Sequence, residues 1–258
     1  MRRILVGHTG FVGGHLDRHL PFEARYNSRN FHDMAGETAD EVVCAGIQAV
    51  KWWANAHPDE DLARIEALLA VLEKTRAKRF VLISTVDVYR DPTGVNERSP
   101  TPKDGLHAYG LNRLRVEEWV RERYEHHLIL RLPGLYGAGL KKNLIFDALT
   151  GGDLSGFDAR ARFQFYDLAR IGAELIHAKA AGLSPVNLAV GPVTAADVVR
   201  TITGARHEVT LDVPPPDYDM RTIHARVWER EGAYLQTAEE CLAEIADFAA
   251  RWRASALP

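Results

Sequence analysis

The sequence predicts an α/β protein in which helices cover a mostly parallel sheet. Short apolar runs alternate along the chain with segments of helical periodicity, the pattern of βαβ units. Two runs, EVVCAG at 41–46 and RFVLIST at 79–85, are almost continuously hydrophobic, as strands covered on both faces must be. The 258 residues, 46% of them hydrophobic, are enough for one large domain and a small satellite.

The first 140 residues are expected to hold the sheet and its helices. Their patterns predict strands over 2–7, 22–27, 41–46, 79–85 and 127–132, and helices over 11–20, 58–76 and 108–124. The helix that starts at Pro58 has the clearest signal, because the acidic run 59–61 suits its first turn. Apolar residues then recur at helical spacing behind this turn.

The second half of the chain has a looser pattern. Residues 151–164 are polar and glycine-rich, which suits a surface or lid segment. Further elements are predicted as a helix at 167–181, a strand at 187–190, a helix after Thr194, and a last helix from Thr237 to about 254. Both threonines are followed three residues later by an acidic residue, which predicts a capping box at each of these last two helices.

Charge and composition exclude several kinds of partner. The net charge is only −3 and no long basic run occurs, so we expect neither nucleic acid nor a membrane surface as partner. The apolar residues of the opening MRRILVG stop after three, so we expect no signal peptide or membrane span and a cytoplasmic location. The two cysteines and 11 histidines lack metal-site spacing, so no metal is expected.

A glycine-rich loop, GHTGFVGGHL, follows the first predicted strand. Gly7, Gly10 and Gly13 are spaced by threes between a strand and a helix, the context in which such a pattern indicates dinucleotide binding. Gly7 permits the turn, Gly10 lets the backbone approach a pyrophosphate, and Gly13 lets the helix pack closely. Amides at the helix start would hold the phosphates, so the candidates are Gly7, Thr9, Gly10, Phe11, Val12 and Gly13. A plain βα turn is the alternative.

The end of the second predicted strand bears on the choice of cofactor. An NAD site usually has an acidic residue there, which binds the ribose hydroxyls. The segment reads YNSRN at 26–30 and contains no acid. Asn27, Ser28 and Arg29 could instead surround a ribose 2′-phosphate, so the sequence favours NADP over NAD. A solvated Arg29 without a ligand is the alternative.

Hydroxyl and charged residues surround the end of the fourth predicted strand. Thr85 lies where a parallel strand meets the ligand crevice, while Tyr109 and Arg113 are four residues apart and share one helix face. A cation beside a tyrosine lowers the phenol pKa from ~10, which prepares it for proton transfer. We predict Tyr109 as acid/base, Arg113 as the cation, and Thr85 as a donor to the same substrate oxygen. A surface pair without a catalytic role is the alternative for Tyr109 and Arg113.

In this order, the motifs resemble the extended short-chain dehydrogenase/reductases, the NAD(P)-dependent sugar-nucleotide epimerase/dehydratase family. The motifs are Gly7-x-x-Gly10-x-x-Gly13, Ser84-Thr85-x-x-Val88-Tyr89, Tyr109-Gly-x-x-Arg113 and Arg131-Leu-Pro-Gly-Leu-Tyr136-Gly137. The resemblance implies a doubly wound Rossmann domain over 1–140, with returning segments near 165–195. It also implies a small carboxyl-terminal substrate-binding lobe, made mostly of residues 141–258 and including the last helix.

The resemblance also implies an activity and a set of contacts. Hydride would pass between the nicotinamide and a sugar carbon, with Tyr109 as acid/base and Thr85 as its hydroxyl partner. The cofactor would also contact Ala45, Gly46, Tyr109, Arg113, Pro133 and Leu135, and Asn143 would face a sugar or sugar-nucleotide substrate. Members of the family commonly dimerise through the helices that correspond to 58–76 and 108–124, so a homodimer is expected.

The chain departs from the family at several positions. The lysine four residues after the tyrosine is Arg113, whose planar guanidinium differs in shape from an ammonium. The asparagine of the preceding helix is replaced around 61–63. Val86 stands where the 4,6-dehydratases have an aspartic acid, so dehydration is not expected. Asp87, one residue on, could supply a carboxylate to the substrate or cap the loop.

Arginines in the second half of the chain could bind the phosphates of a nucleotide. Arginine pairs bidentately with phosphate, and Arg221 is the candidate among them. Together these features predict an NAD(P)-dependent oxidoreductase or epimerase of a nucleotide-linked or related sugar. A dinucleotide-binding sensor or scaffold without turnover is the alternative, motivated by Arg113.

Overall fold

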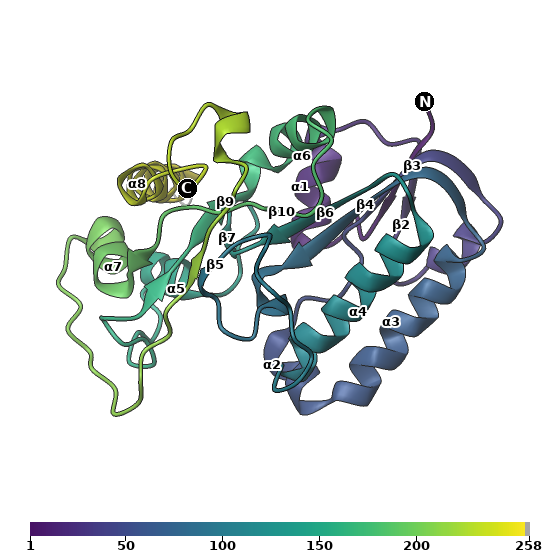
Figure 1. Ribbon diagram of the computed structural model, residues 1–258. Coiled ribbons are helices and arrows are strands. Elements are labelled where there is room, and N and C mark those ends of the chain that lie inside the picture. Colours follow the sequence, from purple (N-terminus) through teal and green to yellow (C-terminus); the bar gives the residue numbers. More distant parts are fainter. Residues whose placement is uncertain (256–258) are drawn as a thin grey trace. The chain divides into compact units, whose positions relative to one another are not determined.

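The computed structural model describes residues 1–255, which form two compact units (Figure 1). The first unit consists of Met1–Arg90, Ser99–Arg131 and Arg170–Val186. The second consists of Asp91–Arg98, Leu132–Ala169 and the chain from Asn187 onward. Residues 91–98 and 132–140, which the sequence places with the sheet domain, therefore lie in the second unit.

The first unit is built on a six-stranded sheet with the order β10-β6-β4-β3-β1-β2. Its strands are β1 (Arg3–Val6), β2 (Ala24–Tyr26), β3 (Thr38–Cys44), β4 (Arg76–Thr85), β6 (His127–Leu132) and β10 (Val186–Asn187). The pairs β1–β2, β1–β3 and β3–β4 are parallel, which confirms the predicted α/β class. β3 and β4 each begin three residues before the predicted run, because their first residues are mostly polar and partly exposed.

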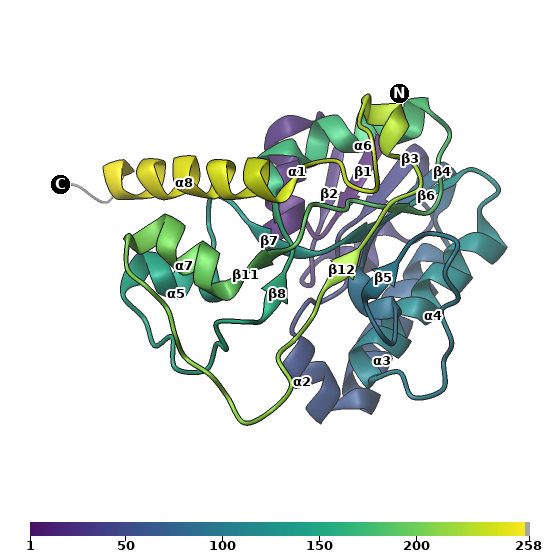
Figure 2. The same ribbon diagram turned by 60° about the vertical axis from the view of Figure 1, so that its left-hand side comes forward.

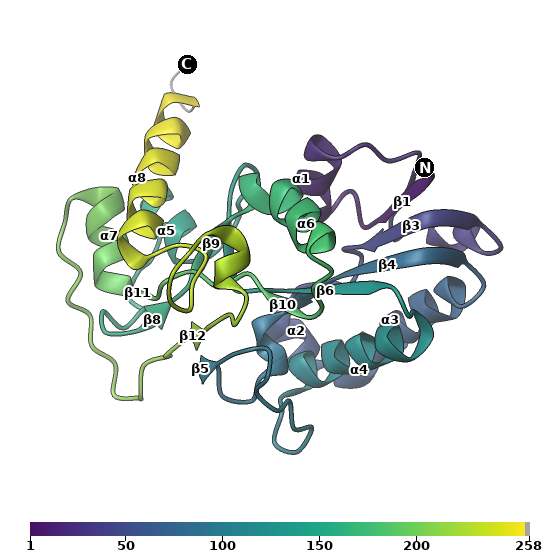
Figure 3. The same ribbon diagram turned by 45° about the horizontal axis from the view of Figure 1, so that its top comes forward.

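Helices cover both faces of this sheet (Figures 1 and 3). On one face α3 (Pro58–Leu72) packs against α4 (Ala108–Arg123), and on the other α1 (Phe11–His19) packs against α6 (Ile171–Ala180). α6 begins later than predicted because a 3-10 turn, η3 (Leu168–Arg170), precedes it. Within residues 1–255, no helix has the length and apolar composition that crossing a membrane requires.

The order of the strands contains one reversal. The chain passes from β1 outward to β2 and then returns to the other side of β1 to form β3. The connection to β3 is short and contains only the 3-10 helix η1 (Phe31–Met34). In open α/β sheets, ligands bind at the carboxyl ends of the strands beside such a reversal, here the ends of β1 and β3.

The second unit contains short sheets and three helices within the described residues (Figure 2). The helices are α5 (Leu144–Thr150), α7 (Ala195–Thr203) and α8 (Ala238–Ser255). The paired strands are β5 (Thr93–Val95) with β12 (Asp219–Met220), β7 (Gly134–Tyr136) with β9 (Phe165–Asp167), and β8 (Arg162–Phe163) with β11 (Val193–Thr194). The segment predicted as surface or lid thus ends in a strand.

Both predicted threonine caps are confirmed, and at α8 the capping box is complete. Thr194 Oγ1 accepts a hydrogen bond from the Asp197 amide (3.0 Å) at the start of α7. At α8, Thr237 Oγ1 accepts from the Glu240 amide (3.2 Å), and Glu240 Oε2 accepts from the Thr237 amide (2.8 Å). The strand predicted at 187–190 is wrong beyond Asn187, because Val190 bridges Gln236 instead of continuing along β6.

Candidate active site

The glycine loop joins β1 to α1, as the sequence predicts. Gly7 has a φ of +89°, and a Cβ there would overlap the Ala45 carbonyl oxygen and lie 2.7 Å from Gly46 Cα. A Cβ on Gly13 would overlap the Gly7 carbonyl oxygen. The ends of β1 and β3 are therefore in direct contact, and neither Gly7 nor Gly13 has room for a side chain.

Gly10 is a glycine for a different reason. The nearest atom to a Cβ there would be the Gly7 carbonyl oxygen at 3.2 Å, and its φ of −79° suits any residue. Packing alone therefore does not require a glycine, and the space beside it is open to a ligand. α1 begins at Phe11 without a side-chain cap, so its first amides and the positive end of its dipole can bind phosphate. The loop thus fits the pyrophosphate of a dinucleotide.

The residues after β2 lie beside this loop. The Gly7 amide donates to the Tyr26 carbonyl oxygen (2.7 Å), and His8 Nδ1 lies 3.2 Å from the same oxygen. Asn27 Oδ1 accepts from the Arg29 amide (2.8 Å), so this side chain shapes the turn. Ser28 and Arg29 are exposed, and the Arg29 guanidinium forms no ion pair with residues 1–255. A 2′-phosphate site here stays a prediction.

Thr85 and Tyr109 are brought together, the first at the end of β4 and the second in the first turn of α4. Tyr109 is 7% exposed, and the Thr85 hydroxyl lowers the pKa of its phenol. The Tyr109 amide donates to Asn55 Oδ1 (2.9 Å), and His107 Nδ1 caps the helix by accepting from the Gly110 amide (3.1 Å). The start of α4 is therefore held beside α2.

Thr85 also contacts Asp87, two residues further along the chain. The Thr85 hydroxyl donates to Asp87 Oδ2 (3.2 Å) and accepts from the Asp87 amide (3.2 Å). The Thr85 hydroxyl also lowers the pKa of the Tyr109 phenol, as a donor to the phenolate does. Thr85 and Asp87 therefore form a hydrogen-bonded pair beside the phenol.

Asp87 is flanked by two basic side chains. Lys51 Nζ lies 2.6 Å from Asp87 Oδ1, and His107 Nε2 lies 3.6 Å from the same oxygen. Burial raises the pKa of Asp87, but the neighbouring His107 and the charge of Lys51 outweigh it and keep the pKa below its ordinary value of 3.8. Asp87 is thus an ionised carboxylate. Together with Tyr109, Thr85, Lys51 and His107 it forms a group of side chains that we call the Tyr109 cluster.

Arg113 lies beside Tyr109 but is already bound. Its side chain is 5% exposed, its Nη2 lies 3.0 Å from Asp61 Oδ1, and its Nη1 also contacts Asp61. Nη2 further donates to the Gln48 carbonyl oxygen, and Cζ lies 3.9 Å from the centre of the Tyr109 ring. Only Nε has no hydrogen-bond partner within residues 1–255. The positive charge of Arg113 is therefore matched by Asp61, in the region where the family has an asparagine.

The pKa of Tyr109 differs from the sequence-based expectation. Arg113 lowers it as predicted, but burial has the larger effect, so the pKa lies above its ordinary value of 10.0. Asp87 adds to the rise, whereas Thr85 and Lys51 oppose it. The expectation of a net depressed pKa is wrong, because it did not include the loss of water around a buried phenol.

The sequence did not reveal Lys51. It lies at the start of α2 (Lys51–Ala56), a helix of six residues that is too short for a periodic signal. Asn55 on the same helix was missed for the same reason. Their partners Asp87 and Tyr109 are 36 and 54 residues away, and no local rule relates residues at such separations.

The remaining candidates belong to the second unit. Pro133 precedes β7, and Leu135 lies within it. Asn143 caps α5 by accepting from the Phe146 amide (3.0 Å), and its Nδ2 donates to the Leu135 carbonyl oxygen (2.9 Å). Arg221 Nη2 lies 2.6 Å from Asp219 Oδ2. Their contacts with cofactor or substrate stay predictions.

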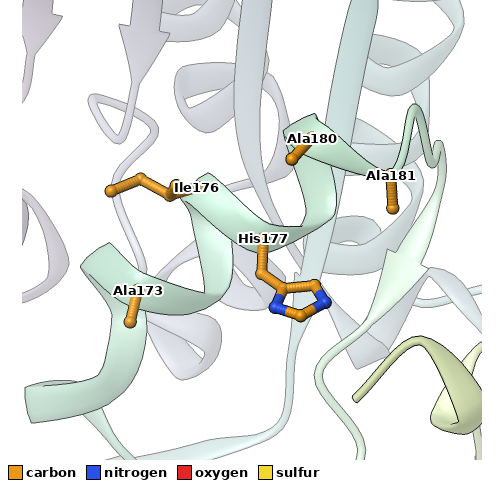
Figure 4. A pocket seen from close by; sticks show the side chains of 5 residues that line it. All are labelled: Ala173, Ile176, His177, Ala180 and Ala181. Atoms are coloured by element: carbon orange, nitrogen blue, oxygen red, sulfur yellow. The ribbon is translucent and has the colours of Figure 1, made fainter. Parts of the chain in front are cut away.

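A hollow on α6 offers no comparable chemistry (Figure 4). It has a volume of about 410 Å³ and is lined by Ala173, Ile176, His177, Ala180 and Ala181. His177 is its one polar side chain, and no residue of the Tyr109 cluster lines it. We therefore place the candidate chemistry at Tyr109 and the glycine loop.

Comparison with protein families gives one match. Residues 26–150 match the NAD dependent epimerase/dehydratase family. This span contains Thr85, Asp87, Tyr109 and Arg113 but begins after the glycine loop. No curated protein sequence matches the chain.

Solved structures are similar over nearly the whole chain. UDP-glucose 4-epimerase from Thermotoga maritima, with UDP-glucose, is 16% identical with a TM-score of 0.71, covering 97% of this chain and 99% of that one. RMD from Pseudomonas aeruginosa, complexed with NADPH, is 20% identical with a TM-score of 0.73, covering 97% and 100%. UDP-glucose 4-epimerase from Bifidobacterium longum, in complex with NAD+ and UDP, is 15% identical with a TM-score of 0.73, covering 99% of each chain.

At these identities the structural likeness shows the fold, and the family match covers the Tyr109 cluster. The resemblance stated from the motifs is therefore confirmed. Residues 26–150 thus match the NAD dependent epimerase/dehydratase family, and over nearly its whole length the chain has the fold of these solved structures.

Proposed function

We propose that this protein is an NAD(P)-dependent oxidoreductase or epimerase acting on a nucleotide-linked or related sugar. One observation carries the proposal: the buried phenol of Tyr109, whose pKa the Thr85 hydroxyl at the end of β4 lowers, lies in the same unit as the open glycine loop. The family match supports this reading, as do structures of the same fold complexed with NADPH or with NAD+ and UDP.

The first unit supplies groups suited to the pyrophosphate and to the adenosine ribose of a dinucleotide. The amides at the start of α1, beside Gly10, would bind the pyrophosphate. Ser28 and Arg29, whose guanidinium forms no ion pair with residues 1–255, would lie toward the adenosine ribose, where a 2′-phosphate suits a guanidinium. We therefore infer a preference for NADP. The bound cofactor would supply hydride exchange with a sugar carbon.

Tyr109 would transfer the proton that accompanies this exchange. Because burial raises its pKa, the phenol is protonated at neutral pH, and its resting form is a proton donor. Thr85 would turn its hydroxyl proton from Asp87 to the same substrate oxygen and hold that oxygen near the phenol. This resting state favours reduction of a sugar carbonyl as the first step, after which the phenolate can accept a proton in the reverse direction.

The experiment is a turnover assay on a panel of UDP-, dTDP- and GDP-linked sugars and their keto forms with NADPH and NADH. Tyr109→Phe should lower turnover by about 100-fold or more while cofactor affinity stays unchanged, because only the proton-carrying hydroxyl is lost. Tyr124→Phe is the matched control, since Tyr124 is equally buried at the other end of α4. Equal turnover in wild type and Tyr109→Phe would refute the proposal.

A second candidate is a dinucleotide-binding sensor or scaffold without turnover. The ion pair between Arg113 and Asp61 favours it, because this guanidinium is not free to bridge the tyrosine and a ribose. Arg113→Lys distinguishes the two functions. Cofactor binding with no turnover in either form, across the same panel, would support the sensor.

We also infer a homodimer that forms through α3 and α4. Ala63, Ala67 and Ala70 lie exposed along one face of α3, where small side chains allow another helix to approach closely. Light scattering of the purified protein tests this. We expect the wild type to be a dimer and the Ala67→Glu variant to be a monomer. A monomeric wild type would refute the inference.

A further inference from the structure

His8 follows the first glycine of the loop, and its ring lies against the last residue of β2. The Nδ1 atom is 3.2 Å from the Tyr26 carbonyl oxygen, which also accepts from the Gly7 amide (2.7 Å). Because a carbonyl oxygen only accepts hydrogen bonds, Nδ1 carries a proton and donates it. The tautomer of a neutral His8 is therefore fixed, with the lone pair on Nε2.

The second nitrogen of this ring is available to a ligand. Within residues 1–255 no hydrogen bond involves Nε2 of His8, and the residue is only partly buried. The neutral ring therefore presents one hydrogen-bond acceptor, held in place through Nδ1, beside the loop that fits a pyrophosphate.

The end of β2, where this ring lies, usually has a different acceptor in dinucleotide-binding folds. An acidic residue there accepts from the hydroxyls of the adenosine ribose. Residues 26–30 contain no acid, and the side-chain oxygens of their two asparagines are used within the turn. Asn27 Oδ1 accepts from the Arg29 amide (2.8 Å), and Asn30 Oδ1 accepts from the Asn27 amide (2.7 Å). The turn thus has a guanidinium for a phosphate but no carboxylate for a hydroxyl.

Two acids follow this turn along the chain. Glu37 accepts from the Tyr26 hydroxyl (3.1 Å) and forms an ion pair with Arg2, so its carboxylate is already bound. Asp33 lies on η1 and is exposed. His8, by contrast, is in hydrogen-bond contact with the last residue of β2 itself.

We propose that His8 is a specificity-determining residue that binds the adenosine ribose 2′-hydroxyl of NAD, in place of the usual acid. Nε2 of His8 would accept from this hydroxyl, whereas Arg29 would bind the 2′-phosphate of NADP. The inference rests on the proposed function only in that a nicotinamide dinucleotide binds at the glycine loop. The chain then has separate residues for the two cofactors.

Two nucleotides that differ only in this hydroxyl test the contact. ADP and 2′-deoxy-ADP are titrated by calorimetry at about pH 8, where imidazoles in general carry no charge. The wild type should bind ADP about fivefold more tightly, which is the effect of one neutral hydrogen bond. His8→Asn should bind both equally, because an asparagine amide can donate to the Tyr26 carbonyl as Nδ1 does but has no atom at the position of Nε2.

Two further variants and a control make this result specific. His8→Phe fills the same space without a nitrogen and should also lose the preference for ADP. His8→Gln, whose amide oxygen reaches the position of Nε2, should retain it. Asp33→Asn is the matched control and should leave the wild-type ratio unchanged. A wild-type ratio in His8→Asn, or loss of the ratio in Asp33→Asn, would overturn the proposal.

Titration with the dinucleotides separates this inference from the proposed function. His8→Asn should weaken NADH binding about fivefold and leave NADPH binding unchanged, whereas Arg29→Gln should do the reverse. If NADH binds but no sugar of the panel is turned over, the proposed function fails while the role of His8 is still supported. If turnover occurs and His8→Asn binds NADH as the wild type does, the inference alone fails. Absence of ADP and NADH binding to the wild type would overturn both.

Discussion

At the scale of single residues, the glycines of the loop serve different purposes. Gly7 and Gly13 have no room for a Cβ, because backbone atoms of the same loop and of residue 45 occupy the space. Gly10 has room for one with a small adjustment, since the nearest atom would lie 3.2 Å away. The first two positions thus maintain the fold, and the third keeps the surface open for a ligand.

This difference predicts opposite outcomes for two alanine substitutions. Gly13→Ala should lower the free energy of unfolding by about 1–3 kcal/mol, as an overpacked site does. Gly10→Ala should keep stability within about 1 kcal/mol of the wild type but weaken dinucleotide binding about tenfold, because its methyl group occupies the approach to the phosphates. Urea unfolding and a binding titration on both variants measure these effects. Equal loss of stability in the two variants would contradict this reading.

At the scale of elements, a buried ion-pair network fastens α4 to the sheet. Glu117 of α4 is fully buried, and its two oxygens accept from Arg131 of β6 at 2.9 and 2.6 Å. Ser84 of β4 donates to the same carboxylate (2.6 Å), and Arg131 also donates to the Tyr89 hydroxyl (2.6 Å). Because Ser84 precedes Thr85 and α4 carries Tyr109, the network holds together the two elements that form the phenol–hydroxyl pair.

Breaking this network should be much more damaging than breaking a surface pair on the same helix. Glu117→Gln leaves Arg131 without its buried counter-charge and should lower the free energy of unfolding by about 3–5 kcal/mol. Glu118→Gln is the control, since Glu118 pairs with the exposed Lys103 (2.8 Å) and should change it by less than about 1 kcal/mol. Chemical unfolding measures the loss of free energy of unfolding in both variants. Similar losses would show that the network does not contribute more to stability than the surface pair.

Local sequence patterns predicted most helices and strands but not the side-chain pairs that join them. Hydrophobic runs revealed the central strands, and threonine caps revealed the starts of α7 and α8. The short helix α2 had no detectable period, and β3 and β4 extend into polar residues that the runs did not include. Arg113 and Asp61 are 52 residues apart, so only the fold shows that the cation of the motif is neutralised.

At the scale of the whole molecule, buried groups that resist ionisation make the fold sensitive to alkali. Burial raises the pKa of Cys44 from 9.0 to about 11. Burial also raises the pKa of Tyr109 and of Tyr124. Because the unfolded chain loses these protons at lower pH than the folded protein does, their contribution to stability is complete below pH 9.0 and declines as the pH rises toward about 11.

The free energy of unfolding should therefore fall as the pH increases from 9.0 to about 11. Cys44→Ala should make this fall less steep, because the variant lacks the contribution of one thiol. The variant will also be less stable at neutral pH, because packing is lost. Urea unfolding at a series of alkaline pH values measures both slopes. A free energy that stays constant over this interval would contradict the assigned burial of these groups.

The central claim is that the open glycine loop binds a nicotinamide dinucleotide. Titration of the purified protein with NADPH and with NADH, followed by fluorescence, tests it most directly, with Gly10→Ala and Arg29→Gln measured alongside. We predict saturable binding of both, tighter for NADPH, with weaker binding in Gly10→Ala and a lost preference for NADPH in Arg29→Gln. Absence of binding by either dinucleotide to the folded wild-type protein would contradict the claim.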